Sequence, residues 1–233
     1  MKKNSIVIFC ILSFLSILNA KEFSNSEIQN IVEDFYYRNN RSLHIWKEGR
    51  SSVLLEANKE SDFYEWKNLV DQDETTAWVE GAAGDGIGEY FLSTISNINE
   101  YGISTSFNYR RKRKINIHLN LINGYCKNES LFKKNNRVKK AKITIYDIPL
   151  NAGVDTMFVD GEPIIILNDI IELDDSMDSQ EFIFETRLAN TNSYCTPVVL
   201  LKFEILDIYK GSDYDDTAIS EIEVFGEYLN TQD

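Results

Sequence analysis

The sequence has few of the residues that catalysis and tight metal binding most often use. It contains two histidines and three cysteines in 233 residues. Neither His44 nor His118 has a serine or cysteine partner in a recognised hydrolase pattern. Basic residues are also in the minority, with 24 Lys and Arg against 37 Asp and Glu. Because such an acidic surface repels nucleic acid and anionic lipid, we expect no nucleic acid partner. The lack of a recognised hydrolase pattern leads us to expect no catalysis.

Long apolar runs are missing after the start of the chain. A positively charged beginning, a short apolar run and the small residue Ala20 predict a secretory signal peptide over residues 1–20. The run is shorter than the roughly 20 residues that span a bilayer, so we expect no transmembrane segment. A lipid on Cys10 is the alternative, weakened by how little apolar sequence precedes it. We therefore expect a protein that is secreted, periplasmic or on the cell surface.

Removal of this leader leaves two cysteines, Cys126 and Cys195. Two is the number that one disulfide of an exported protein needs. Two separate, half-buried thiols fit the sequence as well, because spacing does not show whether the Cα atoms come within bridging distance. No histidine is placed to activate either thiol, so we expect no catalytic role.

The periodicity of the apolar residues changes from helical to strand-like along the chain. Segment Ser26–Tyr37 has helical spacing, which predicts a helix within an N-terminal extension over residues 21–51. Later segments alternate apolar and polar residues and predict half-buried strands, among them Ile115–Leu121, Ala141–Ile145, Leu201–Ile205, Gln180–Thr186 and Ile222–Phe225. We therefore expect one all-β sandwich of two antiparallel sheets over residues 52–233.

One tight hairpin is predicted within this region. Asp160–Gly161 accepts the positive φ angles of a two-residue turn. Short apolar segments, Met157–Val159 and Ile164–Ile166, flank it. The two segments are therefore expected to pair with each other.

A polar, glycine-rich segment, Asn68–Glu89, is the densest candidate site. Asp71, Asp73 and Thr76 are spaced so that one loop can fold their oxygen atoms around a hard cation such as Ca²⁺. An ordinary polar turn, in which the Asp side chains cap backbone amides, explains the same spacing. Spacing alone leaves both interpretations open.

Two basic groups stand out in this acidic chain. One is the run Arg110–Lys114, and the other consists of Lys133, Lys134, Arg137, Lys139 and Lys140. If the two groups converge, they can bind an acidic glycan or an anionic membrane surface. Solvated loops that balance the local acidity are the alternative.

A long motif within Asn68–Glu89 resembles a known family. It reads Asn68-Leu-x-Asp-x-Asp-x-x-Thr-Ala-Trp-Val-Glu-Gly81, followed by Gly84-Asp-Gly-Ile-Gly-Glu89. Shorter matches follow at Asn123–Tyr125, Asn136–Lys139 and Asp216–Ile222. Over roughly Ser52 to Tyr228, the chain is similar to the NADase-type glycan-binding domains, which are similar to the translocation domain of streptococcal NAD glycohydrolase. More distantly, it resembles discoidin, or F5/8 type C, modules.

The resemblance implies a galactose-binding-like jelly-roll sandwich that binds carbohydrate. In such relatives a structural calcium commonly joins an early loop to a glutamate near the final strand. The implied ligands are Asn68, Asp71, Asp73, Thr76 and Glu221. Gln72 stands where relatives often have Gly, so the turn geometry can differ. The sequence contains no counterpart of the streptococcal catalytic domain, so NAD cleavage is not implied.

Carbohydrate binding needs flat rings that stack on sugar C–H faces and planar polar groups that bond to hydroxyls. The candidate rings are Trp78, Tyr125 and Tyr214, and the candidate polar groups are Glu80, Asp85, Asn123 and Arg137. Trp78 is favoured more strongly as an inward-packed anchor of its loop, because a Trp beside a β segment usually packs inward.

The sequence therefore predicts a secreted bacterial carbohydrate-binding module without catalysis. One alternative is a protein-binding adhesin that uses the same loops at one end of the sandwich. The other is a glycan hydrolase that uses Glu80 and Asp85, since glycosidic cleavage needs two carboxyl groups at a defined separation.

Overall fold

The computed structural model describes residues 45–95, 114–148, 150–152, 157–159, 162–189 and 198–229. The expected signal peptide, the expected helix at Ser26–Tyr37 and Cys195 lie outside these residues. The described chain is mostly strand, as an all-β fold requires. In chain order the elements are β1 Ile45–Arg50, η1 Trp66–Leu69, β2 Trp78–Val79, β3 Tyr90–Thr94, β4 Lys114–Asn123, α2 Glu129–Lys134, β5 Asn136–Ile148, β6 Leu150–Ala152, β7 Met157–Val159, β8 Ile164–Glu172, β9 Gln180–Arg187, β10 Val198–Tyr209 and β11 Thr217–Tyr228.

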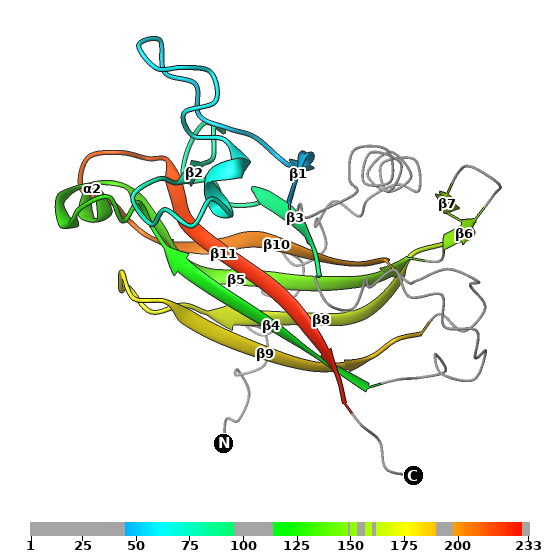
Figure 1. Cartoon of the computed structure of the whole chain (residues 1–233). Helices are drawn as coiled ribbons and strands as arrows, with labels where there is room; N and C mark the ends of the chain where they lie inside the picture. Colours follow the sequence, from blue (N-terminus) through cyan, green and yellow to red (C-terminus); the bar gives the residue numbers. More distant parts are fainter. Residues whose placement is uncertain are drawn as a thin grey trace, which may run out of the picture.

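The strands form the two layers of a sandwich (Figure 1). One layer has the order β1-β3-β10-β5, with β8 on the other side of β5, and the second has the order β11-β4-β9, with β2 beside β11. The neighbours are antiparallel, except for a short parallel contact that joins the layers where Thr217 meets Asn136. The fold is the all-β, galactose-binding-like sandwich that the sequence predicts.

The core lies between these layers and follows the alternation of the sequence. On β4, Ile115, Ile117 and Leu119 are fully buried, while the intervening Asn116 and His118 are only half-buried. Residues from β5, β10, β3 and β11 meet them from both layers. Phe91 of β3 stacks on Phe203 of β10 with ring centroids 4.9 Å apart. Burial of these side chains stabilises the fold by roughly 1.5–3 kcal/mol for each large apolar residue.

Strand β10 departs from the expected half-buried pattern. Its charged residues Lys202 and Glu204 are 2% and 7% exposed. They form an ion pair at 2.6 Å, and the Lys202 ammonium lies 4.7 Å from the Tyr90 ring centroid. Both faces of this central strand are therefore covered, and the charges are tolerated because they are paired.

The predicted hairpin between Met157–Val159 and Ile164–Ile166 is wrong. Strand β7 pairs with β6, whereas β8 pairs with β5 along nearly its whole length. The longer β5 offers β8 a far more extensive hydrogen-bonded edge than the three-residue β7 does. The turn residues Asp160–Gly161 themselves lie outside the described residues.

The sheet also includes residues ahead of position 52, where the sequence places the start of the sandwich. Strand β1 pairs with β3, and Arg50 at its end binds Glu65 through two hydrogen bonds of 3.0 and 2.8 Å. Within the described part of the chain, no helix has the length and apolar character needed to cross a membrane.

Candidate binding site

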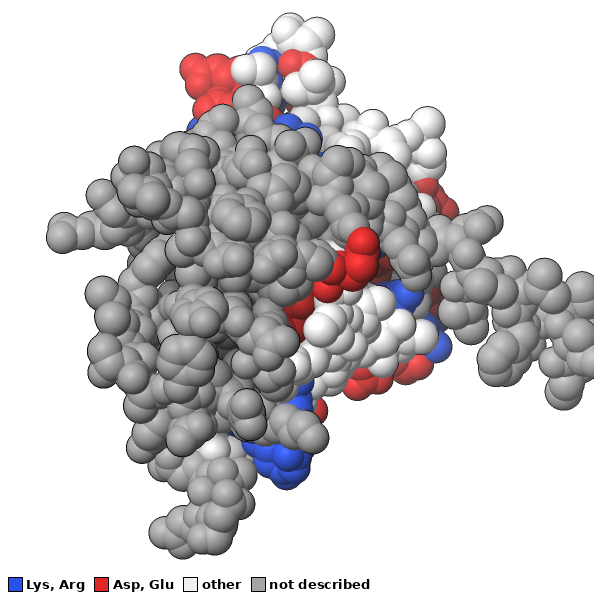
Figure 2. Space-filling view, turned by 90° about the vertical axis from the view of Figure 1, so that its right-hand side faces the viewer, with Lys and Arg blue, Asp and Glu red and all other residues white. Residues whose placement is uncertain are grey.

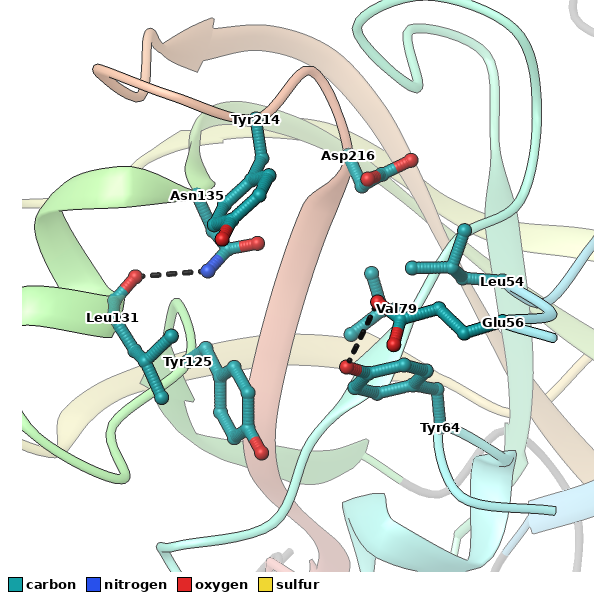
Figure 3. Close-up of a pocket in the computed structure, with 9 residues that line it drawn as sticks. All are labelled: Leu54, Glu56, Tyr64, Val79, Tyr125, Leu131, Asn135, Tyr214 and Asp216. Atoms are coloured by element: carbon teal, nitrogen blue, oxygen red, sulfur yellow. Dashed lines mark hydrogen bonds between the residues drawn. The ribbon is translucent and has the colours of Figure 1, made fainter. Parts of the chain in front are cut away.

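A hollow lies at the end of the sandwich that carries α2 and the β10–β11 loop (Figures 1 and 3). It has a volume of about 70 Å³. Segments from four regions of the chain form it, and it is called the tyrosine hollow below. Its lining residues are Leu54, Glu56, Tyr64, Val79, Tyr125, Leu131, Asn135, Tyr214 and Asp216.

Three tyrosines give the hollow its aromatic walls (Figure 3). Tyr64 precedes η1, Tyr125 follows β4, and Tyr214 lies in the loop before β11. Tyr64 and Tyr125 meet edge to face, with ring centroids 6.3 Å apart and an interplanar angle of 85°. Tyr214 is 46% exposed, whereas Tyr125 is 7% exposed. The hollow therefore has a fixed aromatic base and one ring at its mouth.

A glycine places Tyr125 at this end of the sandwich. Gly124 has a φ of 80° and donates its N–H to the Ala218 carbonyl at 3.1 Å. A Cβ at this position would lie 2.7 Å from side-chain atoms of Arg137 and Phe132. Both the left-handed backbone and the close packing therefore require glycine here.

The wall opposite Tyr64 comes from the short helix α2 and the residue that ends it. Asn128 caps the helix, because its side chain accepts a 2.9 Å hydrogen bond from the Leu131 N–H. Asn135 ends it and donates its amide Nδ2 to the Leu131 carbonyl at 2.9 Å. This bond fixes which side of the amide faces Leu131, so the Asn135 amide oxygen is directed away from the helix (Figure 3).

Two carboxyl groups complete the hollow. Glu56 accepts a 3.3 Å hydrogen bond from the Tyr64 hydroxyl. Burial is the largest cause of the raised pKa of Tyr64, and the nearby Glu56 charge is the second. Burial also raises the pKa of Asp216, and the charges of Asp215 and Glu56 raise it further. The Tyr64 hydroxyl therefore stays a neutral donor beside the two carboxyl groups.

Of the seven predicted ligand-binding residues, Tyr125 and Tyr214 lie in the hollow. Trp78 does not, because it is fully buried, donates its indole N–H to the Ser52 carbonyl at 3.0 Å, and packs edge to face on Phe91. The structure therefore places Trp78 inside the fold as an inward anchor of its loop and not at the hollow.

Glu80 and Asn123 are also fully buried, and the structure does not bring them to the hollow. Glu80 accepts the backbone N–H groups of Thr217 and Ala82 at 3.0 and 2.8 Å, and burial raises its pKa to about 7. Asn123 donates to the Val138 carbonyl at 2.7 Å and accepts the Val138 N–H at 2.9 Å. Both side chains tie segments of the sandwich together.

The other two predicted polar contacts are engaged in ion pairs. Arg137 is 6% exposed and forms two hydrogen bonds with Asp175, at 2.9 and 2.7 Å. The Asp85 carboxylate pairs with Lys210. Neither residue lines the hollow.

Sequence reasoning missed four residues of the hollow, which are Glu56, Tyr64, Asn135 and Asp216. Asp216 lies only two residues after the predicted Tyr214.

The predicted calcium residues are brought together only in part. Asp73 donates its backbone N–H to Glu221 Oε1 at 2.9 Å across 148 residues of sequence. Burial, followed by the contact with the Asp71 carboxyl, raises the pKa of Glu221 to about 7. Gln72, which lies between Asp71 and Asp73, has a φ of 63°. It therefore adopts the left-handed backbone conformation for which glycine is better suited.

The remaining candidate ligands are directed elsewhere. The Asp73 carboxylate accepts from the N–H and hydroxyl of Thr75 at 2.9 and 2.6 Å. The Thr76 hydroxyl donates to Asp71 Oδ2 at 2.9 Å, and buried Asn68 donates to the Phe63 and Ala77 carbonyls. No group of three Asp, Glu, His or Cys side chains in the described ranges is arranged as a metal site. The loop thus combines a hydrogen-bonded turn with one close carboxyl pair.

The two basic groups do not converge where the structure describes them. Lys114 begins β4 and pairs with Glu185, whereas the second group lies on and after α2, beyond the other end of β4. The members of the second group pair with Glu129, Asp213, Asp175, Asp207 and Glu172. Figure 2, which views the molecule from the side away from α2, also shows acidic and basic side chains next to each other. Residues 110–113 lie outside the described chain.

Cys126 is a half-buried thiol next to β4. Its Sγ donates to the Asn123 carbonyl at 3.2 Å, and burial raises its pKa to about 11. Its suggested disulfide partner, Cys195, is among the residues that are not described.

The chain matches the family model described as NAD glycohydrolase translocation F5/8 type C domain. The match covers residues 37–225. It therefore spans the hollow, the loop from Asp71 to Thr76, called the Asp71 loop, and Glu221. No curated protein matches the chain.

Proposed function

The chain belongs to the NAD glycohydrolase translocation F5/8 type C domain family, and we propose that it binds a glycan in the tyrosine hollow. The observation that carries this proposal is the gathering of Tyr64, Tyr125 and Tyr214 around one hollow with polar groups between them. Residues brought together from distant parts of a chain in one solvent-facing depression are typical of a ligand site.

The chemistry of the hollow suits a sugar. Apolar side chains and tyrosine rings offer surfaces for the C–H faces of a pyranose ring. Glu56, Asp216 and the Asn135 amide oxygen accept hydrogen bonds from hydroxyls, and the tyrosine hydroxyls donate them. The hollow has a volume of only about 70 Å³ and does not enclose a long chain, so we propose recognition of a terminal residue at its mouth.

The proposal extends to the type of protein. We propose a module that acts by binding alone, is exported by its N-terminal leader and meets its glycan on a host or cell-envelope surface. The states of the two carboxyl groups that a glycan hydrolase would use support binding without catalysis. Glu80 is buried, and Asp85 is paired with Lys210.

We propose that calcium, where present, is held by the carboxylates of Asp71 and Glu221. Their contact and the raised pKa of Glu221 mark a place where a cation relieves like-charge repulsion. Calcium prefers such carboxylate oxygens and can add backbone carbonyls and waters. Its part is to fix the loop to β11, away from the residues that touch the glycan.

A glycan array on the mature protein tests the binding proposal. The parent is compared with Tyr214→Ala, which removes an exposed ring at the mouth of the hollow, and with Tyr228→Ala as control. Tyr228 is also exposed, but it lies at the other end of β11. Glycan binding that is lost in Tyr214→Ala and kept in Tyr228→Ala supports the proposal. Binding that survives both changes, or no binding to any glycan by the folded parent, overturns it.

A further inference from the structure

The carboxyl groups of the tyrosine hollow lack the cations that pair with the acids around them. Near the hollow, Glu129 pairs with Lys133, Asp213 with Lys134, and Asp215 with Lys210. Within the described residues, neither Glu56 nor Asp216 forms an ion pair, and no Lys, Arg or His lines the hollow. Among the described residues, no ion pair therefore neutralises the two carboxylates of the hollow.

The walls of the hollow attract positive charge as well. The faces of aromatic rings carry negative electrostatic potential and attract cations. Three tyrosines surround the space here, and the whole chain carries a net charge of −13. Rings and carboxylates thus favour the same kind of ligand group.

We propose that the hollow selects a saccharide with a free, protonated primary amine, such as an amino sugar that is not acetylated. This rests on the proposed glycan binding and specifies its ligand. A primary ammonium has three N–H donors, and Glu56, Asp216 and the Asn135 amide oxygen are acceptors for them. A quaternary ammonium has no N–H donor, so it is attracted by the rings and the charges but cannot donate hydrogen bonds to these acceptors. Acetylation removes the charge and adds bulk to a hollow of about 70 Å³.

The test measures binding of matched oligosaccharides by calorimetry at moderate salt. The probes are a glucosamine oligomer, the N-acetylglucosamine oligomer of the same length, and choline. The variant is Glu56→Gln with Asp216→Asn, which removes both charges and changes little in shape. The control is Asp178→Asn with Glu181→Gln, which removes two exposed charges outside the hollow.

We expect the parent to bind the glucosamine oligomer at least about tenfold more tightly than its acetylated counterpart. The hollow variant should lose this preference and the control variant should keep it. Equal losses in both variants mean that bulk charge attracts the oligomer, which overturns the inference. Choline binding that exceeds glucosamine binding overturns the choice of a primary amine.

The test also separates this inference from the proposed function. Tyr214-dependent binding of the acetylated oligomer without preference for the free amine overturns the inference and leaves glycan binding intact. Absence of binding to the glucosamine oligomer, the acetylated oligomer and the glycan array overturns both.

Discussion

The backbone N–H of Asp73 donates a 2.9 Å hydrogen bond to the carboxylate of Glu221, and this bond joins points that are 148 residues apart in the chain. It fastens the Asp71 loop to the last strand of the sandwich. Because Glu221 also contacts the Asp71 carboxyl, the attachment is sensitive to the protonation of Glu221 and to cations.

Stability should fall as the pH rises from about 4.5 to about 7. The pKa of Glu221 is raised from 4.5 to about 7 in the folded chain, so over this interval the native state keeps a proton that the unfolded state has released. Stability then decreases with pH, and Glu80, whose pKa is raised in the same way, adds to the decrease. Thermal melts in chelator at about pH 5 and pH 7.5 measure it.

Glu221→Gln should flatten this dependence in part, since it removes one of the two groups. Glu223→Gln, two positions along the same strand, is the control and should melt with the pH dependence of the parent. An unchanged slope in Glu221→Gln would show that Glu221 does not keep its proton in the fold.

Calcium should stabilise the protein more at about pH 7.5 than at about pH 5, because protonation of Glu221 competes with the metal. At a hundred times its dissociation constant, free calcium adds roughly 2.7 kcal/mol to the free energy of unfolding. Asp71→Ala should abolish this shift and alter the melting of the calcium-free protein little. A plain turn gives the opposite pattern, with no calcium shift in the parent and a loss of stability in Asp71→Ala.

Asn123→Ala should lower the free energy of unfolding by about 1–3 kcal/mol, because it leaves the buried N–H and carbonyl of Val138 without partners. Asn120→Ala is the control, since Asn120 lies on the outer face of the same strand and bonds only to exposed Glu223. Urea unfolding measures both. Equal stabilities of the two variants would contradict the bridging role of Asn123, and a folded Asn123→Ala protein should still bind its glycan.

Cys126 should be a poorly reactive thiol. With Cys195 replaced by Ser, the folded mature protein should react with a disulfide reagent at about pH 8 on the order of 100-fold more slowly than the urea-unfolded chain. Burial raises the pKa of Cys126 to about 11, and only the thiolate reacts. Equal rates in the folded and unfolded chains would show that this thiol is not held as the structure describes.

The sequence predicts the sandwich well because alternating burial leaves a period of two, which β4 shows most clearly. The apolar residues of β4 and β5 are buried as their spacing indicates, and so are the apolar residues of β10 from Val199 to Ile205. Pairing is harder to predict, because local turn chemistry favours β7 beside β8 while the long edge of β5 binds β8 instead. Burial of Lys202 and Glu204 likewise depends on which strand is central, which no local pattern reveals.

The candidate site could be predicted only in part for a similar reason. The sequence predicts Tyr125 and Tyr214 as ligand contacts because each is an aromatic residue next to a loop. Glu56 and Tyr64 become part of the same hollow only through folding of the segment between β1 and β2. Polar residues within the long motif, such as Glu80, look like ligand contacts in sequence, yet they bond to the backbone inside the sandwich.

The most direct test of glycan binding in the tyrosine hollow is an NMR measurement of contacts between sugar and tyrosine ring protons. The mature protein is labelled on tyrosine and mixed with its best ligand, and the ring signals are assigned through single Tyr→Phe variants. We predict nuclear Overhauser effects from sugar C–H protons to Tyr214 and Tyr125, and none to Tyr228. Contacts to Tyr228, or a bound sugar without contact to any ring of the hollow, would contradict the proposed site.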